Sequence, residues 1–318
     1  MRVSPTVLNR RHERRALLTA WVARRWRFRF SLRALLVFVS LLCVWLAHEV
    51  RRAHEQAKVV DAIRHINATV TYAPRPIVPQ GSVGGMLLGD DLFAEVESIG
   101  FHEFSRANHD RFSVLSQLTS LRSISLGKSD VTDARLTAIR NLRRLRQVGL
   151  GKTRIGDAGL ACLAELRELE DLYLNETQIT DAGLKHLTEL SHLKSLTLSN
   201  TRITDEGLKV VGSLSGLDHL NLDNTQITDD GLSHLAGLTC IAGLSLAGTQ
   251  ITDAGLAHLQ GLTRLRFLSL DHTNLRGEGL KYLRRLSDLR QVTVQGTQVT
   301  ADDEAELRKA LPKYGVFR

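Results

Sequence analysis

The sequence predicts an α/β solenoid, built from stacked strand–helix units and preceded by a single N-terminal transmembrane helix. Two observations predict this fold class. Leucine recurs every 24 residues, first at Leu118 and last at Leu286, with no insertion or deletion between the units. An uncharged apolar run, residues 34–47, follows a segment rich in arginine. Because self-similarity at a fixed period marks repeat architectures, the eight units determine the fold of residues 118–300.

Each unit has apolar residues at positions 1, 4, 7, 9, 14, 19 and 22, as in the third unit, LRELEDLYLNETQITDAGLKHLTE, residues 166–189. Positions 7 and 9 alternate like a strand whose two side chains face one core. Positions 19 and 22, with positions 1 and 4 of the next unit, suit a helical return path. One unit cannot bury its leucines alone. We therefore expect inward-pointing side chains on adjacent parallel strands at Leu172, Leu196, Leu220 and Leu244.

Threonine, aspartate and glycine also recur at fixed positions of the unit. Thr180 is a predicted helix N-cap, and Asp181 lies where the helix dipole favours a negative charge. Glycine at position 18, as at Gly183, predicts a close approach between neighbouring coils. Thr177, at position 12, has a hydroxyl that can bond the backbone at the turn after the strand.

The pattern LxxLxxLxLxxTxITDxGLxxL resembles the leucine-rich repeat, in the 24-residue form of membrane-anchored bacterial repeat proteins and of the substrate-binding half of F-box proteins. It covers residues 118–300, more than half of the chain. The resemblance implies a curved solenoid with parallel strands on the concave face and helices on the convex face. It gives almost no information about the partner.

The resemblance also implies that positions 6, 8, 10 and 11 point outward on the concave face. These positions carry mainly acidic, amide and other polar side chains in units three to five, with Phe267 nearer the C-terminus. We expect this surface to bind a protein or peptide; the alternative is that these are solvated strand residues that confer solubility. The candidate binding residues are Asp171, Tyr173, Asn175, Glu176, Thr197, Asn200, His219, Asn221, Asp223, Asn224, Phe267 and Asp271.

No motif in the sequence points to catalysis, so we expect no catalytic residue and no cofactor. His186, His234 and His258 share position 21, but other units place Cys162 or Tyr282 there. Repeat duplication explains this row better than a metal site, and we expect no metal. An odd number of cysteines without a close pair also argues against a disulfide framework or a zinc site.

The net charge of +8 is concentrated at the N-terminus. Residues 1–33 contain ten arginines against one acid, Glu13, a net charge of +9, so the rest of the chain carries −1. We therefore expect no nucleic acid as a partner of the repeats.

Residues 30–48 are the predicted transmembrane helix, with Trp45 at the interface opposite Arg33. The positive-inside rule places the N-terminus in the cytoplasm and the repeats on the extracytoplasmic side, which is the periplasm if the host is a Gram-negative-type bacterium. The alternatives are a cleaved signal peptide, for which the residues before Ala47 and Ala53 fit poorly, and a buried or peripheral helix.

The remaining segments complete the predicted organisation. Residues 1–29 form a basic cytoplasmic tail, 49–85 a helical connector with a Pro/Gly linker, 86–117 a degenerate capping repeat and 301–318 a C-terminal cap. The predicted function is a non-catalytic, membrane-anchored repeat protein that binds a protein or peptide on its concave face. The alternative is an adaptor in a ubiquitin-ligase-like pathway of substrate recognition. The sequence does not specify an oligomeric state.

Overall fold

The computed structural model describes four stretches of the chain: residues 32–64, 68–72, 96–101 and 106–311. By its internal contacts the chain divides into two compact units, Met1–Ala53 and His54–Arg318. The predicted basic tail and the Pro/Gly linker, from residue 73 to residue 85, lie outside the described residues. The first ten residues of the predicted capping repeat and the last seven of the C-terminal cap also lie outside them.

The first described element is the helix α2 (Leu32–Arg64), which is 33 residues long. Its uncharged run covers only residues 34–47, with Arg33 before it and Glu49 after it. Among the residues that the structure describes, no helix is both long enough and apolar enough to cross a membrane. The transmembrane span predicted over residues 30–48 is therefore not supported by the described part of the chain.

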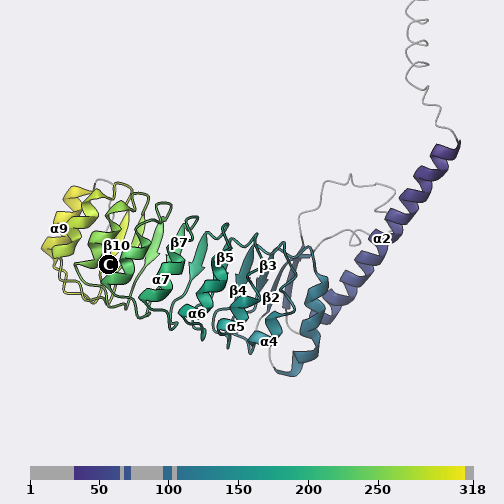
Figure 1. The fold of residues 1–318 in the computed structure, drawn as a ribbon, viewed down its shortest axis with the longest axis horizontal. Coiled ribbons are helices and arrows are strands. Elements are labelled where there is room, and N and C mark those ends of the chain that lie inside the picture. The colour runs from purple at the N-terminus through teal and green to yellow at the C-terminus, as the bar shows by residue number, and fades with distance from the viewer. Residues whose placement is uncertain (1–31, 65–67, 73–95, 102–105, 312–318) are drawn as a thin grey trace, which may run out of the picture. The chain divides into compact units, whose positions relative to one another are not determined.

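Ten strands of the described chain form one sheet in sequence order (Figure 1). The first strand pairs with the second in antiparallel orientation, and every later pair is parallel. A parallel neighbour at each step is what a solenoid with one strand per coil requires. The strands are β1 (Ala68–Tyr72), β2 (Val96–Phe101), β3 (Ser123–Ser125), β4 (Gln147–Gly149), β5 (Asp171–Tyr173), β6 (Ser195–Thr197), β7 (His219–Asn221), β8 (Gly243–Ser245), β9 (Phe267–Ser269) and β10 (Gln291–Thr293).

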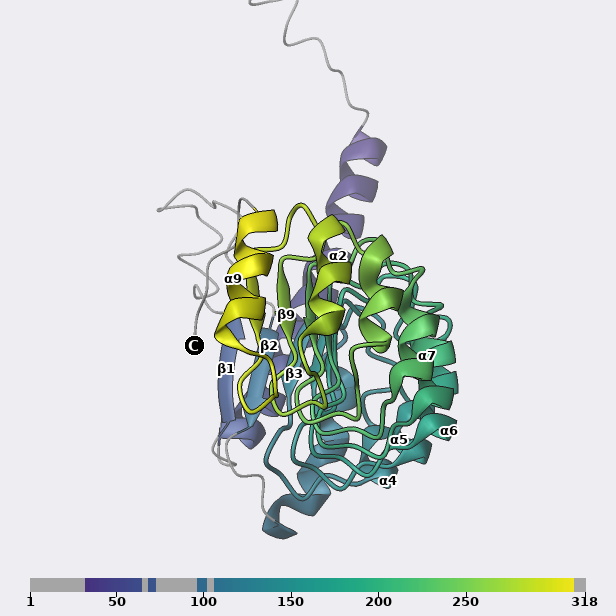
Figure 2. The same ribbon diagram turned by 90° about the vertical axis from the view of Figure 1, so that its left-hand side faces the viewer.

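Short helices pack on the side of the sheet away from its exposed face (Figure 2). They are shorter than the predicted return path, because positions 1 and 4 of each unit lie in turns. Apolar positions three residues apart also match the period of a 3-10 helix, and several coils use one. The helices are η1 (Arg106–Gln117), α4 (Asp133–Leu136), α5 (Asp157–Ala161), α6 (Asp181–Leu184), η2 (Lys185–Leu187), α7 (Asp205–Val211), α8 (Asp229–Leu232), η3 (Ser233–Leu235), η4 (Gly255–Gly261), η5 (Glu278–Arg285) and α9 (Ala301–Ala310).

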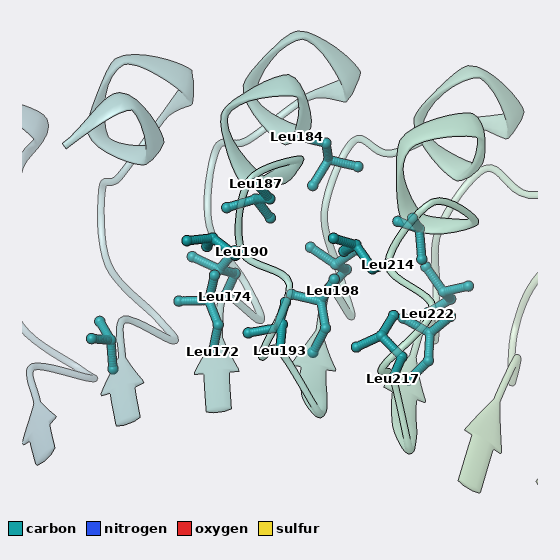
Figure 3. Close-up of a cluster of buried hydrophobic side chains, with 14 of the residues drawn as sticks. Leu172, Leu174, Leu184, Leu187, Leu190, Leu193, Leu198, Leu214, Leu217 and Leu222 are labelled. Carbon is teal, nitrogen blue, oxygen red and sulfur yellow. The ribbon is translucent and has the colours of Figure 1, made fainter. Parts of the chain in front are cut away.

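The leucines of successive coils form one continuous core between strands and helices (Figure 3). Leu196 pairs with Leu172 on one side and with Leu220 on the other, and Leu220 pairs in turn with Leu244. All four side chains are buried. The predicted arrangement of these leucines is confirmed. Because the strand residues at positions 6 and 8 alternate with them, those side chains point to the opposite face, which we call the strand face.

Aspartates at position 16 bind each coil to the next. Asp229 accepts hydrogen bonds from the backbone N–H of Thr252, at 2.8 Å, and from its hydroxyl, at 2.5 Å. Asp157, Asp181 and Asp205 make the same pair of bonds to the threonine of the following coil. We call these contacts the Asp–Thr clamps. They explain the glycine at position 18, since a Cβ on Gly255 would overlap the Asp229 carboxylate.

Two threonines of the clamps, Thr180 and Thr204, also cap helices with their side chains, as predicted for Thr180, whereas Thr228 makes no capping hydrogen bond. The Thr180 hydroxyl accepts a hydrogen bond from the Ala182 N–H at 3.3 Å, and the Thr204 hydroxyl accepts one from the Glu206 N–H at 3.4 Å. At position 12, the Thr177 hydroxyl donates to the Leu174 carbonyl of its own coil at 2.6 Å. The polar residues that recur in each unit therefore satisfy the backbone groups that helix and strand ends leave unpaired.

Position 11 of every unit has a left-handed backbone. Its φ is +57° at Lys128 and +53° at Asn224, and Gly248 and Gly296 hold the same place in later units. Glycine adopts this conformation at no steric cost and asparagine tolerates it, whereas other L-residues are strained there. The turn after each strand therefore favours Asn and Gly at this position for a reason unrelated to ligands.

We expect Lys128→Gly to raise the free energy of unfolding by roughly 0.5–1 kcal/mol, because relief of left-handed strain outweighs the entropy that glycine adds to the unfolded chain. Lys128 is exposed, and its backbone N–H bond to the Gly151 carbonyl remains in the variant. Urea denaturation followed by circular dichroism measures the change. Lys128→Ala is the control, since it removes the same side chain but keeps the strain; an equal gain in both variants would contradict the explanation.

Candidate peptide-binding site on the strand face

A hollow of about 300 Å³ opens on the strand face over β6 to β10. Gly243, on β8, lies at its centre, between His219 on β7 and Phe267 on β9. These three residues are neighbours at position 6 of successive units. Because Gly243 has no side chain, the His219 ring leans over its backbone, with Cδ2 2.7 Å from where a Cβ would lie, and the hollow opens between this ring and Phe267.

The floor of the hollow is apolar. Leu220, Leu244 and Leu268 are each 2% exposed, whereas Leu172 and Leu196 are fully buried. The small exposure marks the place where the leucine core reaches the surface. Hydroxyl side chains surround this floor, including Thr197, Ser245, Ser269 and Thr293. Such a site combines an apolar base with a polar rim, as ligand sites usually do.

Phe267 is the most conspicuous side chain of this rim, with 47% of its surface exposed. In the described part of the unit His54–Arg318, Tyr72 is the one other large hydrophobic residue with comparable exposure. An aromatic ring held on a rigid strand loses little conformational entropy when it binds a partner, so it is a suitable anchor for recognition.

The structure groups the predicted site residues into four sets. Thr197, His219, Asn221 and Phe267 line the hollow. Asp171 and Tyr173 lie on β5, next to β6 on the same sheet. The hollow therefore lies nearer the C-terminus than the middle of the predicted surface, which was centred on units three to five.

The aspartates at position 10 are engaged within the protein. The Asp223 carboxylate accepts hydrogen bonds from the Ala247 N–H at 2.8 Å, the Ser245 hydroxyl at 2.6 Å and the Asn221 amide at 3.0 Å. Asp271 accepts bonds from the Gln295 N–H at 2.7 Å and the Thr293 hydroxyl at 2.9 Å. Both carboxylates bridge their own coil to the next, which accounts for their presence.

The other predicted residues belong to the turns after the strands. Glu176, Asn200 and Asn224 occupy the left-handed position 11, and Glu176 also pairs with Lys152 at 3.0 Å. The Asn175 amide occupies the space that a side chain at Gly151 would need. Their residue types therefore have local structural explanations.

Sequence reasoning missed Gly243 and the serines Ser245 and Ser269 as parts of a site. The signal for Gly243 is present in the sequence. Position 6 carries a side chain in all the other units. Gly243 is the single glycine at this position, and it falls between His219 and Phe267 of the adjacent units. A search for exposed polar residues overlooks a site that is defined by an absent side chain.

Charge on the strand face is one-sided. No Lys or Arg occupies position 6, 8 or 10 in any of the eight units, whereas Asp171, Asp223 and Asp271 do. Asp171 differs from the other two because its carboxylate has no hydrogen bond or ion pair with another described side chain. Partial burial raises the pKa of Asp171, and the neighbouring Glu170 carboxylate raises it further, while Lys194 and His219 act in the opposite direction.

Groups of histidine, cysteine and acidic residues that can hold a metal ion are absent from the described residues. The three cysteines, Cys43, Cys162 and Cys240, are free. The pKa of the Cys162 thiol is raised by burial, which disfavours the reactive thiolate.

A family model described as "Leucine Rich repeat" matches residues 189–212 and 217–236. These residues carry parts of the fourth and fifth units, including β6 and β7. Residues 189–236 therefore carry leucine-rich repeats. The leucine-rich repeat region agrees with the match in period, strand register and buried leucines. No curated protein matches the chain by sequence.

Solved structures with a similar fold include two internalins of Listeria monocytogenes. Internalin InlF is 25% identical with a TM-score of 0.54, and the match covers 64% of this chain and 62% of the internalin, less than two thirds of its length. Internalin C2 is 24% identical with a TM-score of 0.51, covering 63% of this chain and 81% of its own. A leucine-rich repeat protein of Leptospira interrogans matches at 18% identity and a TM-score of 0.47, covering 65% and 62%.

The two internalin matches agree with a leucine-rich repeat solenoid of parallel strands. Leucine-rich repeat proteins commonly mediate protein–protein interactions and are typically non-catalytic scaffolds. The geometry of the strand face is consistent with that general role.

Proposed function

We propose that the leucine-rich repeat region is a non-catalytic receptor for a polypeptide, which binds across the strand face and places an apolar side chain in the hollow at Gly243. The observation that carries the proposal is the hollow itself, where core leucines reach the surface beside the exposed Phe267 ring. Burial of an apolar side chain gains roughly 1.5–3 kcal/mol, which raises the affinity about 10- to 100-fold.

The repeat architecture supports this proposal through its rigidity. Each strand is fixed by the leucine core and by the Asp–Thr clamps, so the backbone positions of His219 and Phe267 are set before a partner arrives. A preorganised surface loses little conformational entropy on binding.

Gly243→Leu is expected to weaken binding at least tenfold, because the new side chain fills the hollow. Position 6 already carries His and Phe in adjacent units, and a Cβ at Gly243 meets only the movable His219 ring, at 2.7 Å from Cδ2. The variant should therefore fold. We would select binders from a phage-displayed random peptide library on the immobilised 318-residue chain, then titrate them against both proteins.

Gly237→Leu is the matched control, since Gly237 is exposed and no atom lies within 4 Å of a Cβ placed there. Selected peptides should bind this control as they bind the parent protein. If no peptides are enriched, or if binding to Gly243→Leu is undiminished, the strand face is not a peptide receptor centred on the hollow.

We also propose that residues 30–48 hold the protein at a membrane, with the N-terminus cytoplasmic and the repeats extracytoplasmic, in the periplasm if the host is a Gram-negative-type bacterium. The support is that large apolar side chains of α2 are exposed to solvent: Leu32, Leu35, Leu36, Val37, Phe38, Val39, Leu41, Leu42, Val44, Trp45 and Leu46. Such a patch is costly in water and marks a membrane or protein contact.

Leu36→Asp/Leu41→Asp is expected to move the protein from the carbonate-washed membrane fraction to the supernatant, because a charge in the apolar half of α2 is expensive to place in lipid. Arg51→Asp, in the charged part of the same helix, should remain with the membranes. Recovery of the parent protein in the supernatant would refute membrane attachment. To test the side of the membrane, a membrane-impermeant maleimide should label Lys209→Cys in spheroplasts more strongly than the parent protein, whose free cysteines give the background. Labelling above this background only after lysis would refute the extracytoplasmic position of the repeats.

A further inference from the structure

The chemistry of the strand face limits which polypeptide fits it. Positions 6, 8 and 10 carry no Lys or Arg, and the Asp171 carboxylate on β5 makes no hydrogen bond or ion pair with another described side chain, while Asp223 and Asp271 accept hydrogen bonds within the protein. The nearest ion pairs involve the adjacent Glu170, which accepts from Lys194 at 2.6 Å and Arg146 at 3.4 Å. These two cations are therefore already engaged, and Asp171 is the carboxylate left available for a cation of the partner.

The distance between Asp171 and the hollow corresponds to a definite length of extended peptide. Asp171 on β5 and Gly243 on β8, at the hollow, both occupy position 6, so they lie in the same row of the sheet. Three strand steps of ~4.8 Å separate them by about 14 Å, which an extended chain covers in about four residues at ~3.4 Å each. Side chains of an extended chain alternate in direction, so residues i and i+4 point to the same side, whereas i and i+3 do not.

Of the two intervening strands, β6 presents only short side chains to such a chain, whereas β7 presents the exposed His219 ring. Position 6 is Ser195 on β6 and position 8 is Thr197, both short side chains. His219, on β7, forms the near rim of the hollow, where its Nδ1 lies 3.0 Å from the Asp218 carboxylate. A chain that crosses these strands passes from an anionic end, over hydroxyl groups, to an apolar end.

We infer that the partner segment is an extended peptide with a Lys or Arg four residues away from a large apolar residue. Its cation pairs with Asp171 and its apolar side chain fills the hollow beside Phe267. This inference rests on the proposed receptor function and deepens it by specifying the chemistry and spacing of the ligand.

Fluorescein-labelled synthetic nonapeptides, titrated by anisotropy against the 318-residue chain, test the inference. One series places Lys and Phe at i and i+4 in either order, with Ser and Thr elsewhere; a second uses i and i+3; a third replaces Lys with Gln. In one of the two orders, the i, i+4 peptide should bind about tenfold more tightly than the i, i+3 peptide and than the peptide with Gln in place of Lys. A tenfold difference is the effect expected of one charge-assisted hydrogen bond. Added NaCl should reduce this difference.

Protein variants assign the effect to Asp171. Asp171→Asn should lose about tenfold for the Lys peptide and nothing for the Gln peptide, while Asp230→Asn, at an exposed site on α8, should change neither. The inference fails if Lys and Gln peptides bind equally, if spacing has no effect, or if no peptide of the series binds. The proposed receptor function still holds after those outcomes if the binding of library-selected peptides depends on Gly243. It is refuted independently if that binding does not depend on Gly243.

Discussion

Leu196→Ala is expected to lower the free energy of unfolding by about 3–5 kcal/mol, the range observed when a fully buried leucine is truncated and leaves a cavity. Leu196 is completely buried and lies between Leu172 and Leu220 on adjacent strands. Its loss therefore removes packing from two coil interfaces at once. Chemical denaturation followed by far-UV circular dichroism measures the change.

Ser195→Ala is the control for this prediction. Ser195 is the preceding residue on β6, but its side chain points to the strand face. The change should stay within about 0.5 kcal/mol, as expected for a surface substitution. If Leu196→Ala costs no more than Ser195→Ala, the leucines do not form the shared core that holds the solenoid together.

Asp229→Ala is expected to lower the free energy of unfolding by about 2–3 kcal/mol, because it removes two hydrogen bonds to a charged acceptor and leaves the Thr252 N–H without its partner. The truncation also opens space over Gly255, against which the carboxylate packs. The effect should appear as a lower midpoint in urea, with the secondary structure retained in water.

The neighbouring acid on the same helix supplies a matched comparison. Asp230 is exposed and follows Asp229 in the first turn of α8, so both residues interact with the helix dipole. We expect Asp230→Ala to cost less than about 1 kcal/mol, the usual limit of a dipole contribution at the surface. Equal losses in the two variants would mean that the dipole, and not the clamp to Thr252, explains the aspartate.

The leucine core and the strand register were predictable from the sequence because repetition removes ambiguity. In a single strand, a pair such as Leu172 and Leu174 is a weak signal. Eight copies at one period fix both the strand and its parallel neighbours. The same repetition identified the helix caps at Thr180 and Thr204, since each lies directly before an Asp at the same position of its unit.

Features that depend on contacts between coils were harder to predict from the sequence. From the sequence, Asp181 was predicted to interact with the helix dipole. Its carboxylate instead accepts hydrogen bonds from Thr204 of the next coil, 23 residues away. Asn200 and Asn224 were predicted to be recognition residues, but the left-handed backbone of the turn explains the presence of asparagine at these positions. Gly243 is visible in the sequence as the one glycine at position 6, but the repeat pattern alone does not show that a hollow opens there between His219 and Phe267.

The most direct test of the account is to locate a bound peptide on the protein. p-Benzoylphenylalanine, placed at Phe267 or at the exposed Lys209 on α7, reports proximity by photo-crosslinking to a library-selected peptide. We expect a crosslink at position 267, on the strand face, and none at position 209 on the helical side. Crosslinking at 209 but not at 267 would contradict the claim that the strand face is the binding surface.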